Sequence, residues 1–382
     1  MATALSPAAV LSPSCKAASR ARRMIGSGSV AAHRACGWSS KAAAALSGAT
    51  PIAALQASHS RSRPAFAHST VTRVVAAGAA PGSAGTVAVA GATGLVGTAL
   101  VKQLLSSGYS VKVLTRNVVS ARNKLPYPGL QFVAPAQWSQ AVCGTTAVVN
   151  LAGEPIATRW TAEVKAEVKR SRVAVTSQLA AAINACPADQ RPKVLVNSSA
   201  VGFYGNSESQ TFSEASQAGR DYLAEVCKAW EDAAAAAQTR VVVLRTGIVL
   251  AKEGGALGRM IPVFSIFAGG PLGSGRQWCS WIHRDDVVGM ILEAINNDSW
   301  QGSYNATAPN PVRMGELCSA LGSVMGRPSL VPVPDFALRT LLGEGANVVL
   351  EGQRVVPTRA QEAGFKFQYS QVGDALRNVL RR

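Results

Sequence analysis

The stretch DYLAEVCKAWED, from Asp221 to Asp232, contains a tyrosine, Tyr222, and a lysine, Lys228. A tyrosine and a lysine on one face of a helix can move a proton, because the ammonium group lowers the pKa of the phenol. Six residues advance a helix by about 600°, which leaves these two side chains about 120° apart on different faces. The stretch is therefore predicted to be a helix whose tyrosine and lysine do not act as one unit.

A second motif, GATGLVG, places Gly91, Gly94 and Gly97 between an apolar stretch, TVAVA, and a helical pattern, LVGTALVKQLLSS. Such a turn must be tight, must let its backbone approach a pyrophosphate, and must pack its helix close to a sheet. The helix N-terminus then offers N–H groups to an anion. The alternative is a turn without a ligand, since the chain has 35 glycines. The strand–loop–helix context favours a dinucleotide site.

The residue that follows the second expected strand selects between the two nicotinamide cofactors. NAD sites usually place an Asp or Glu there, to bind the ribose 2′-hydroxyl group. Here the strand ends in LTRN, and the first acidic residue of the whole chain is Glu154. The guanidinium of Arg116 can instead pair with a 2′-phosphate, which predicts NADP(H). The alternative is a solvated surface arginine.

Strands and helices alternate from Thr86 onward and would position these motifs. The pattern predicts a parallel sheet covered on both faces, that is, an α/β fold with a doubly wound (Rossmann) sheet. Beyond Leu250 the alternation breaks down, and we expect a smaller C-terminal lobe. The expected domains are residues 84–305, with a cleft-forming segment at 251–283, and residues 306–382. The expected strands span 86–90, 110–116, 130–135, 147–153, 193–200, 240–250 and 302–309, and the expected helices include 95–107, 161–184 and 281–295.

Longer motifs resemble the extended, epimerase-like form of the short-chain dehydrogenase/reductase superfamily. They include GATGLVG, NLAGEPIATRWTAEVKAEVKRSRV, RTGIVLAKEGGALGRM, GGPLGSGRQWCSWIHRDD and LEGQRVVPTRAQEAGFKFQY. More narrowly, they resemble its atypical NADP-binding epimerase-like family, from Thr86 to the C-terminus. The resemblance implies a Rossmann domain followed by a short C-terminal domain.

The resemblance also implies contacts with the cofactor. It assigns to the pyrophosphate Gly91, Thr93, Gly94, Leu95, Val96 and Gly97. It assigns to the adenosine phosphate Thr115 and Arg116. It assigns to the nicotinamide side Leu151, Ala152, Gly153 and Glu154.

The family pattern counted back from Glu231 sharpens the interpretation of the first motif. Leu223 falls where active reductases have their tyrosine, and Cys227 falls where they have their lysine. Ser199 ends the fifth expected strand and is a candidate for substrate or cofactor contact; a structural hydroxyl is the alternative. Tyr204, in GFYG, is a candidate proton donor, although packing beside the cofactor pocket is favoured.

The motif WIHRDD contains the remaining candidates. His283 follows the expected cleft, but the family pattern favours a structural role that pins the sheet to the next helix. Asp285 and Asp286 are expected to cap that helix. Trp278, Trp281 and Arg276 are expected to face the cleft, with a packed lobe interface as the alternative. No spacing of Cys, His and carboxylate residues resembles a metal site.

The N-terminal 80 residues resemble an organellar leader. They carry nine Lys or Arg residues and no acidic residue, and they are rich in Ala and Ser. This composition predicts a transit peptide at residues 1–76 and a chloroplast location, in the stroma and with peripheral contact with the inner envelope left open. The alternatives are a mitochondrial transit peptide and a low-complexity tail that carries no targeting signal. The leader contributes much of the net charge of +17. The remaining basic residues form no concentrated stripe, so nucleic acid is not an expected partner.

Seven cysteines occur without a C-x-x-C pair, and those after the leader are expected to be buried thiols in a reducing compartment. No apolar run approaches the roughly 20 residues that cross a bilayer.

Two functions remain open. One is an NADP(H)-dependent oxidoreductase or epimerase that transfers hydride to or from a small carbonyl or sugar-like substrate. The other is a non-catalytic NADP(H)-binding regulator or scaffold, which the family resemblance links to plastid division.

Overall fold

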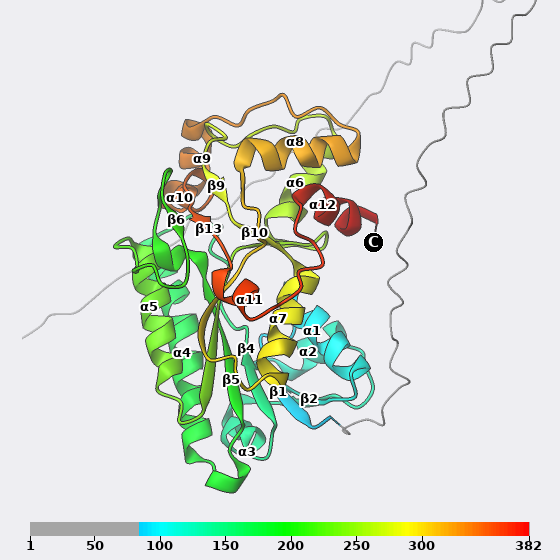
Figure 1. Cartoon of the computed structure of the whole chain (residues 1–382), viewed down its shortest axis with the longest axis vertical. Coiled ribbons are helices and arrows are strands. Elements are labelled where there is room, and N and C mark those ends of the chain that lie inside the picture. Colours follow the sequence, from blue (N-terminus) through cyan, green and yellow to red (C-terminus); the bar gives the residue numbers. More distant parts are fainter. Residues whose placement is uncertain (1–83, 382) are drawn as a thin grey trace, which may run out of the picture. The chain divides into compact units, whose positions relative to one another are not determined.

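The computed structural model describes residues 84–381, and the leader expected at residues 1–76 lies outside them. A parallel sheet of seven strands forms the centre, in the order β11-β7-β5-β4-β1-β2-β3 (Figure 1). This confirms the expected doubly wound sheet. The strand order reverses between β1 and β4, where ligands bind in open α/β sheets. The strands are β1 (Thr86–Ala90), β2 (Ser110–Leu114), β3 (Gln131–Val133), β4 (Ala147–Asn150), β5 (Val194–Ala200), β7 (Arg240–Thr246) and β11 (Gly302–Ala306).

Helices cover both faces of this sheet, as the apolar strands require. One face packs against α1 (Leu95–Ser106), α2 (Val118–Lys124) and α7 (Arg284–Asn296). The other packs against α3 (Trp138–Val142), α4 (Ala162–Ala185) and α5 (Tyr222–Ala235). The two apolar layers fix the carboxyl ends of the strands, from which the expected cofactor residues extend.

A C-terminal lobe with its own apolar core lies beyond the carboxyl ends of the strands (Figure 1). It contains α6 (Gly255–Ser265), α8 (Met314–Met325), α9 (Asp335–Leu342), α10 (Asn347–Leu350) and α12 (Val372–Arg381). Its short strands are β8 (Ile248–Leu250), β9 (Trp278–Cys279), β10 (Trp281–His283), β12 (Val312–Arg313) and β13 (Arg354–Val355). The helix α11 (Thr358–Glu362) packs instead against β11 and the core of the main sheet. The short elements η1 (Pro135–Gln137), η2 (Ala188–Gln190), η3 (Val201–Tyr204), β6 (Thr211–Phe212) and η4 (Gly343–Ala346) complete the chain.

The long strand expected at residues 240–250 is divided at Gly247. The segment before it, β7, stays in the main sheet, whereas β8 pairs with β10. A methyl group added at Gly247 would lie 2.2 Å from the carbonyl oxygen of Ser280. The close passage of a second chain segment therefore requires glycine here and turns the strand into the lobe.

The helix expected at residues 281–295 begins three residues later, after β10, and His283 is its N-cap. The ring nitrogen Nδ1 of His283 accepts a hydrogen bond from the backbone N–H of Asp285. Asp286 has a different role from the capping expected of it. Its carboxylate accepts hydrogen bonds from the backbone N–H groups of Gln368 and Tyr369, at 2.7 and 3.1 Å. Asp286 thus ties α7 to the C-terminal segment, and His283 has the structural role that was favoured.

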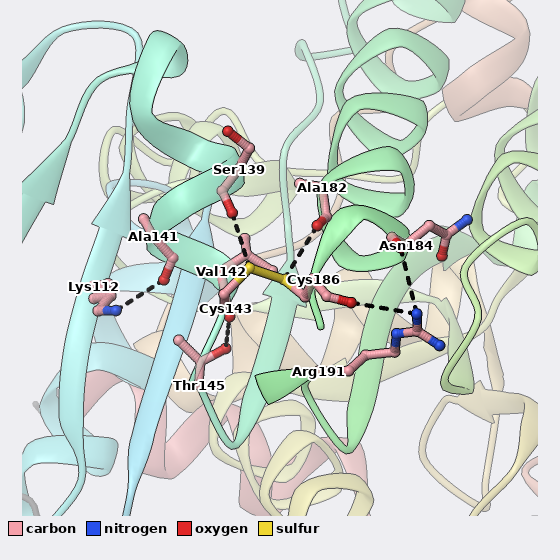
Figure 2. Close-up of a disulfide and its surroundings, with 10 residues drawn as sticks. All are labelled: Lys112, Ser139, Ala141, Val142, Cys143, Thr145, Ala182, Asn184, Cys186 and Arg191. Atoms are coloured by element: carbon pink, nitrogen blue, oxygen red, sulfur yellow. Dashed lines mark hydrogen bonds between the residues drawn. A yellow bond between two sulfur atoms is a disulfide. The ribbon is translucent and has the colours of Figure 1, made fainter. Parts of the chain in front are cut away.

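The cysteines correct another expectation. Cys227, Cys279 and Cys318 are buried free thiols, as expected, but Cys143 and Cys186 form a disulfide across 43 residues of sequence (Figure 2). The two lie at the ends of α3 and α4, with their Cα atoms 5.4 Å apart. The tertiary fold, rather than a local motif, brings them together, so their spacing gave no signal. In the chain-entropy account, closing a ring of this length stabilises the fold by about 4 kcal/mol.

Asp286 generates a prediction about pH. Burial raises the pKa of this carboxyl to about 6, with a smaller contribution from the charge of Asp285, despite the two backbone N–H groups that favour its charged form. Because the folded-state pKa lies above the unfolded value, this group contributes stability below about pH 4 that is lost as the pH rises through about 6. In the native protein this group should lower the free energy of unfolding by up to about 3 kcal/mol as the pH rises from about 4 to above 6, and Asp286→Asn should remove this decrease. Denaturant titrations at pH 4, 5, 6 and 7 measure how the free energy of unfolding of each protein changes with pH. The same pH dependence in both proteins would contradict this assignment.

Candidate functional site

The glycines of the turn between β1 and α1 have distinct tasks. Gly91 has a φ of 76°, and a methyl group there would lie 2.5 Å from the backbone carbon of Leu151. A methyl group at Gly97 would lie 2.3 Å from the carbonyl oxygen of Gly91. At Gly94 it would meet only that same oxygen, at 3.3 Å. Gly91 and Gly97 are therefore required by the fold, whereas Gly94 is exposed and leaves its surroundings open.

The start of α1 is suited to an anion. Gly94 is the N-cap and supplies no side chain to the first turn, which contains no acidic residue. The N–H groups of the first turn of any α-helix lack helical partners, and the helix dipole favours negative charge there. The side chain of Leu95 packs beside Gly254 and Gly255 at the start of α6, where added methyl groups would lie 3.4 and 3.3 Å from it. The segment 251–283 thus borders the turn. Thr93 and Val96, also predicted for this site, lie half-buried in the turn and in the first turn of α1.

The end of β2 brings together two predicted residues from different motifs. Arg116 Nη2 lies 3.0 Å from Glu154 Oε1, and both side chains are substantially exposed. Thr115 holds the turn, because its Oγ1 accepts a hydrogen bond from the backbone N–H of Asn117. Glu154 was expected on the nicotinamide side, but its contact with Arg116 places it beside the residue predicted to meet the adenosine phosphate.

Hydrogen bonds from α4 and from the end of β4 hold the loop that follows β4. The backbone N–H of Ala152 donates to Asn150 Oδ1, and that of Glu154 donates to the hydroxyl of Ser171. The guanidinium of Arg172 donates to the carbonyl of Glu154 at 2.9 Å, and a methyl group at Gly153 would lie 3.1 Å from this guanidinium. The backbone of this loop, which includes Leu151, Ala152 and Gly153, is therefore fixed without any ligand.

A buried network contains both residues that were candidates for catalysis. Ser199 donates to Glu231 at 2.7 Å, and Glu231 forms two hydrogen bonds of 2.9 and 2.8 Å with Arg245. Arg245 also donates to the hydroxyl oxygen of Tyr204, which donates to Asn305 at 2.7 Å.

The environment of this network keeps the hydroxyl group of Tyr204 protonated. The side chains of Arg245 and Glu231 are 7% and 12% exposed. Arg245 lies over the ring of Phe203, with its guanidinium carbon 3.4 Å from the ring centre. Burial raises the pKa of Tyr204, although Arg245 opposes this shift. Tyr204 is therefore held as a neutral phenol between Arg245 and Asn305.

The side chains of α5 confirm that its tyrosine and lysine are not paired. Tyr222 donates to the carbonyl oxygen of Lys165 on α4, and Lys228 forms an exposed ion pair with Asp232. The side chains of Leu223 and Cys227, which occupy the positions of the usual tyrosine and lysine, instead pack beside the backbone of Gly202. Burial raises the pKa of the Cys227 thiol to about 11, so it is uncharged at neutral pH.

The residues that sequence reasoning missed are mostly those that support others. Ser171 and Arg172 on α4 hold the loop after β4. Arg245 and Asn305 bind the hydroxyl group of Tyr204, and Glu231 binds Arg245. Arg245 carried one usable signal, a charge inside an otherwise apolar strand, because buried charges need partners. The predicted Trp281 is fully buried in the core of the C-terminal lobe instead of facing a cleft.

The described part of the chain shows neither a metal cluster nor a membrane-spanning helix. Within residues 84–381, no group of three or more His, Cys, Asp or Glu side chains is placed to hold a metal ion. Over the same residues, no helix combines the length and apolar character that crossing a membrane requires.

Comparison with known proteins identifies the family. The model of the NAD dependent epimerase/dehydratase family matches residues 87–306, and that of a domain of unknown function, DUF1731, matches residues 333–379. The chloroplastic epimerase family protein SDR39U1 homolog of Arabidopsis thaliana is 55% identical over 300 residues, which cover 77% of this chain and 86% of that protein. The epimerase family protein ML0860 of Mycobacterium leprae is 38% identical over 298 residues, covering 76% and 94%.

Solved structures agree. The human epimerase family protein SDR39U1, crystallised with NADPH, superposes with a TM-score of 0.72 at 33% identity and covers 78% of this chain and 99% of that one. A nucleoside-diphosphate sugar epimerase from Corynebacterium glutamicum gives a TM-score of 0.62 at 32% identity, covering 77% and 58%. With the glycine turn, the seven-stranded sheet and the C-terminal lobe already in place, these matches show that the chain belongs to the NAD dependent epimerase/dehydratase family of extended short-chain dehydrogenases/reductases.

Proposed function

We propose that this chain is an NADP(H)-binding protein of the plastid in which the bound nucleotide is sensed rather than turned over. Binding rests on the turn from Gly91 to Gly97, whose exposed Gly94 leaves room for a pyrophosphate at the N-terminus of α1. A human relative was crystallised with NADPH, and an Arabidopsis relative is named as chloroplastic. Both support the cofactor and the location.

The observation that carries the regulatory role is the state of the residues that would move a proton. Tyr204 and Ser199 each donate to a fixed acceptor inside the protein. Leu223 has no proton to give, and the buried thiol of Cys227 donates to the carbonyl oxygen of Ala200 at 3.7 Å. Hydride transfer to a carbonyl needs a proton donor within hydrogen-bond reach. The arrangement therefore favours binding without turnover over an oxidoreductase or epimerase acting on a small carbonyl or sugar-like substrate, although the latter remains the competing function.

Two substitutions of Gly94 test cofactor binding without disturbing the fold. Gly94→Asp should fold, because Asp is a favourable N-cap and the site is open, but its carboxylate would repel the pyrophosphate and lower NADPH affinity by about 100-fold or more. Gly94→Asn is the matched control, since it has the same shape without the charge and should bind more tightly than the Asp variant. Titration of NADPH fluorescence measures both. Equal affinities in the two variants would contradict a phosphate at this position.

Arg116 and Glu154 test the choice of NADP(H). Arg116→Gln should weaken NADPH binding about tenfold and leave NADH binding unchanged, because only NADPH carries the 2′-phosphate. Glu154→Gln removes the competing partner of Arg116 and should strengthen NADPH binding slightly, by less than about fivefold, since exposed ion pairs contribute less than about 1 kcal/mol. Calorimetric titration with both cofactors decides. A loss of NADPH and NADH affinity by the same factor in Arg116→Gln would overturn the assignment.

Tyr204 tests whether the network is structural. Tyr204→Phe leaves Arg245 and Asn305 each without one buried partner, and should lower the free energy of unfolding by about 1–3 kcal/mol. NADPH affinity should not change. Urea titration and NADPH binding measure the two effects. A variant that unfolds like the native protein but loses an NADPH-dependent turnover would show that Tyr204 is catalytic.

A further inference from the structure

The disulfide between Cys143 and Cys186 encloses a functionally important part of the chain. The ring that it closes contains all of β4, the loop at residues 151–160 and all of α4. One end of the ring enters β4, and the other is the C-cap of α4. The bond therefore encloses the whole unit that carries the predicted cofactor residues from Leu151 to Glu154.

Within this ring, side chains of α4 form hydrogen bonds with β4 and with the loop at residues 151–160. Ser171 and Arg172 hold the backbone of Glu154. Thr176, one turn further along α4, accepts from the side chain of Asn150 at 2.8 Å. A shift of α4 relative to β4 would thus act on the loop directly, because the same helix turns that would move also supply its hydrogen bonds.

The surroundings of the disulfide allow exchange with an external thiol. Cys143 is half-buried at the surface end of α3, whereas Cys186 is 3% exposed. Two cationic side chains donate hydrogen bonds to backbone carbonyls of the segments that carry the two cysteines. Arg191 donates to the carbonyl of Cys186, and Lys112 donates to the carbonyl of Ala141, two residues before Cys143 (Figure 2). Cationic groups favour thiolates, which are the species that enter and leave in disulfide exchange.

We propose that Cys143 and Cys186 form a reversible redox switch that sets the affinity of the loop at residues 151–154 for NADP(H). A dithiol reductant attacks Cys143 Sγ as a thiolate, and Cys186 Sγ leaves as a thiolate and takes up a proton. The second thiol of the reductant then displaces Cys143 from the mixed disulfide. Two electrons and two protons pass to the protein, and the reductant ends as a disulfide. The oxidised form holds α4 against β4 and binds NADP(H) more tightly.

The effect on affinity rests on the proposed cofactor binding, so two readouts are needed. The full chain is prepared oxidised and after treatment with dithiothreitol, and NADPH is titrated into each. The oxidised form should bind at least about fivefold more tightly, within the usual range of coupling between sites. Cys143→Ser should match the reduced form without reductant. Cys318→Ser, which alters a buried free thiol of the C-terminal lobe, should retain the redox response.

The second readout does not depend on the cofactor. Hydrogen exchange of residues 147–185 should be faster in the reduced protein, while β7 and the C-terminal lobe stay unchanged. Alkylation should label Cys143 and Cys186 only after reduction of the folded protein. Equal exchange in both states, or a disulfide that resists dithiothreitol until the protein unfolds, would overturn the switch. Faster exchange with no NADPH binding in either state would refute the cofactor proposal and the effect on affinity, but would retain a redox-controlled α4.

Discussion

The buried ion pair between Arg245 and Glu231 constrains the part of the molecule where chemistry would be expected. Through it, β7 and α5 are joined to β5 by Ser199, to η3 by Tyr204 and to β11 by Asn305. Removing one member of such a pair leaves a buried charge uncompensated and typically costs 3–5 kcal/mol. In this structure the hydroxyl groups of Ser199 and Tyr204 already donate to protein acceptors, Glu231 and Asn305.

The edge of the sheet at β1, β2 and β4 is built differently. Its glycines are present because backbone segments pass close to one another, and its loop is held by α4 before any ligand arrives. Preorganised backbone of this kind suits binding, because little further ordering is needed when the nucleotide enters. The protein thus combines a preorganised nucleotide-binding edge with a buried network in which the hydroxyl groups of Ser199 and Tyr204 already donate to protein acceptors.

Much of this arrangement could be predicted from the sequence because it depends on local patterns. The strand TVAVA, the glycine turn and α1 follow from apolar periodicity and from glycine spacing, and the structure places them as predicted. The separation of Tyr222 from Lys228 also follows from helix geometry alone.

The features that could not be predicted depend on segments distant in the sequence. The break at Gly247 is required by Ser280, and the role of Asp286 is set by the backbone at Gln368 and Tyr369. The contact between Arg116 and Glu154 joins two different loops. Cys143 and Cys186 become neighbours only when α4 is folded against β4.

The central claim is that the chain binds NADPH and does not oxidise it. The most direct measurement follows the nicotinamide absorbance of NADPH in complex with the purified protein while aldehydes, ketones and nucleotide sugars are added in turn. The account predicts saturable binding of NADPH and no oxidation above the rate in free solution with any of these compounds. Oxidation of bound NADPH by one of them, faster than in solution and abolished when Gly94 is replaced by Asp, would contradict it.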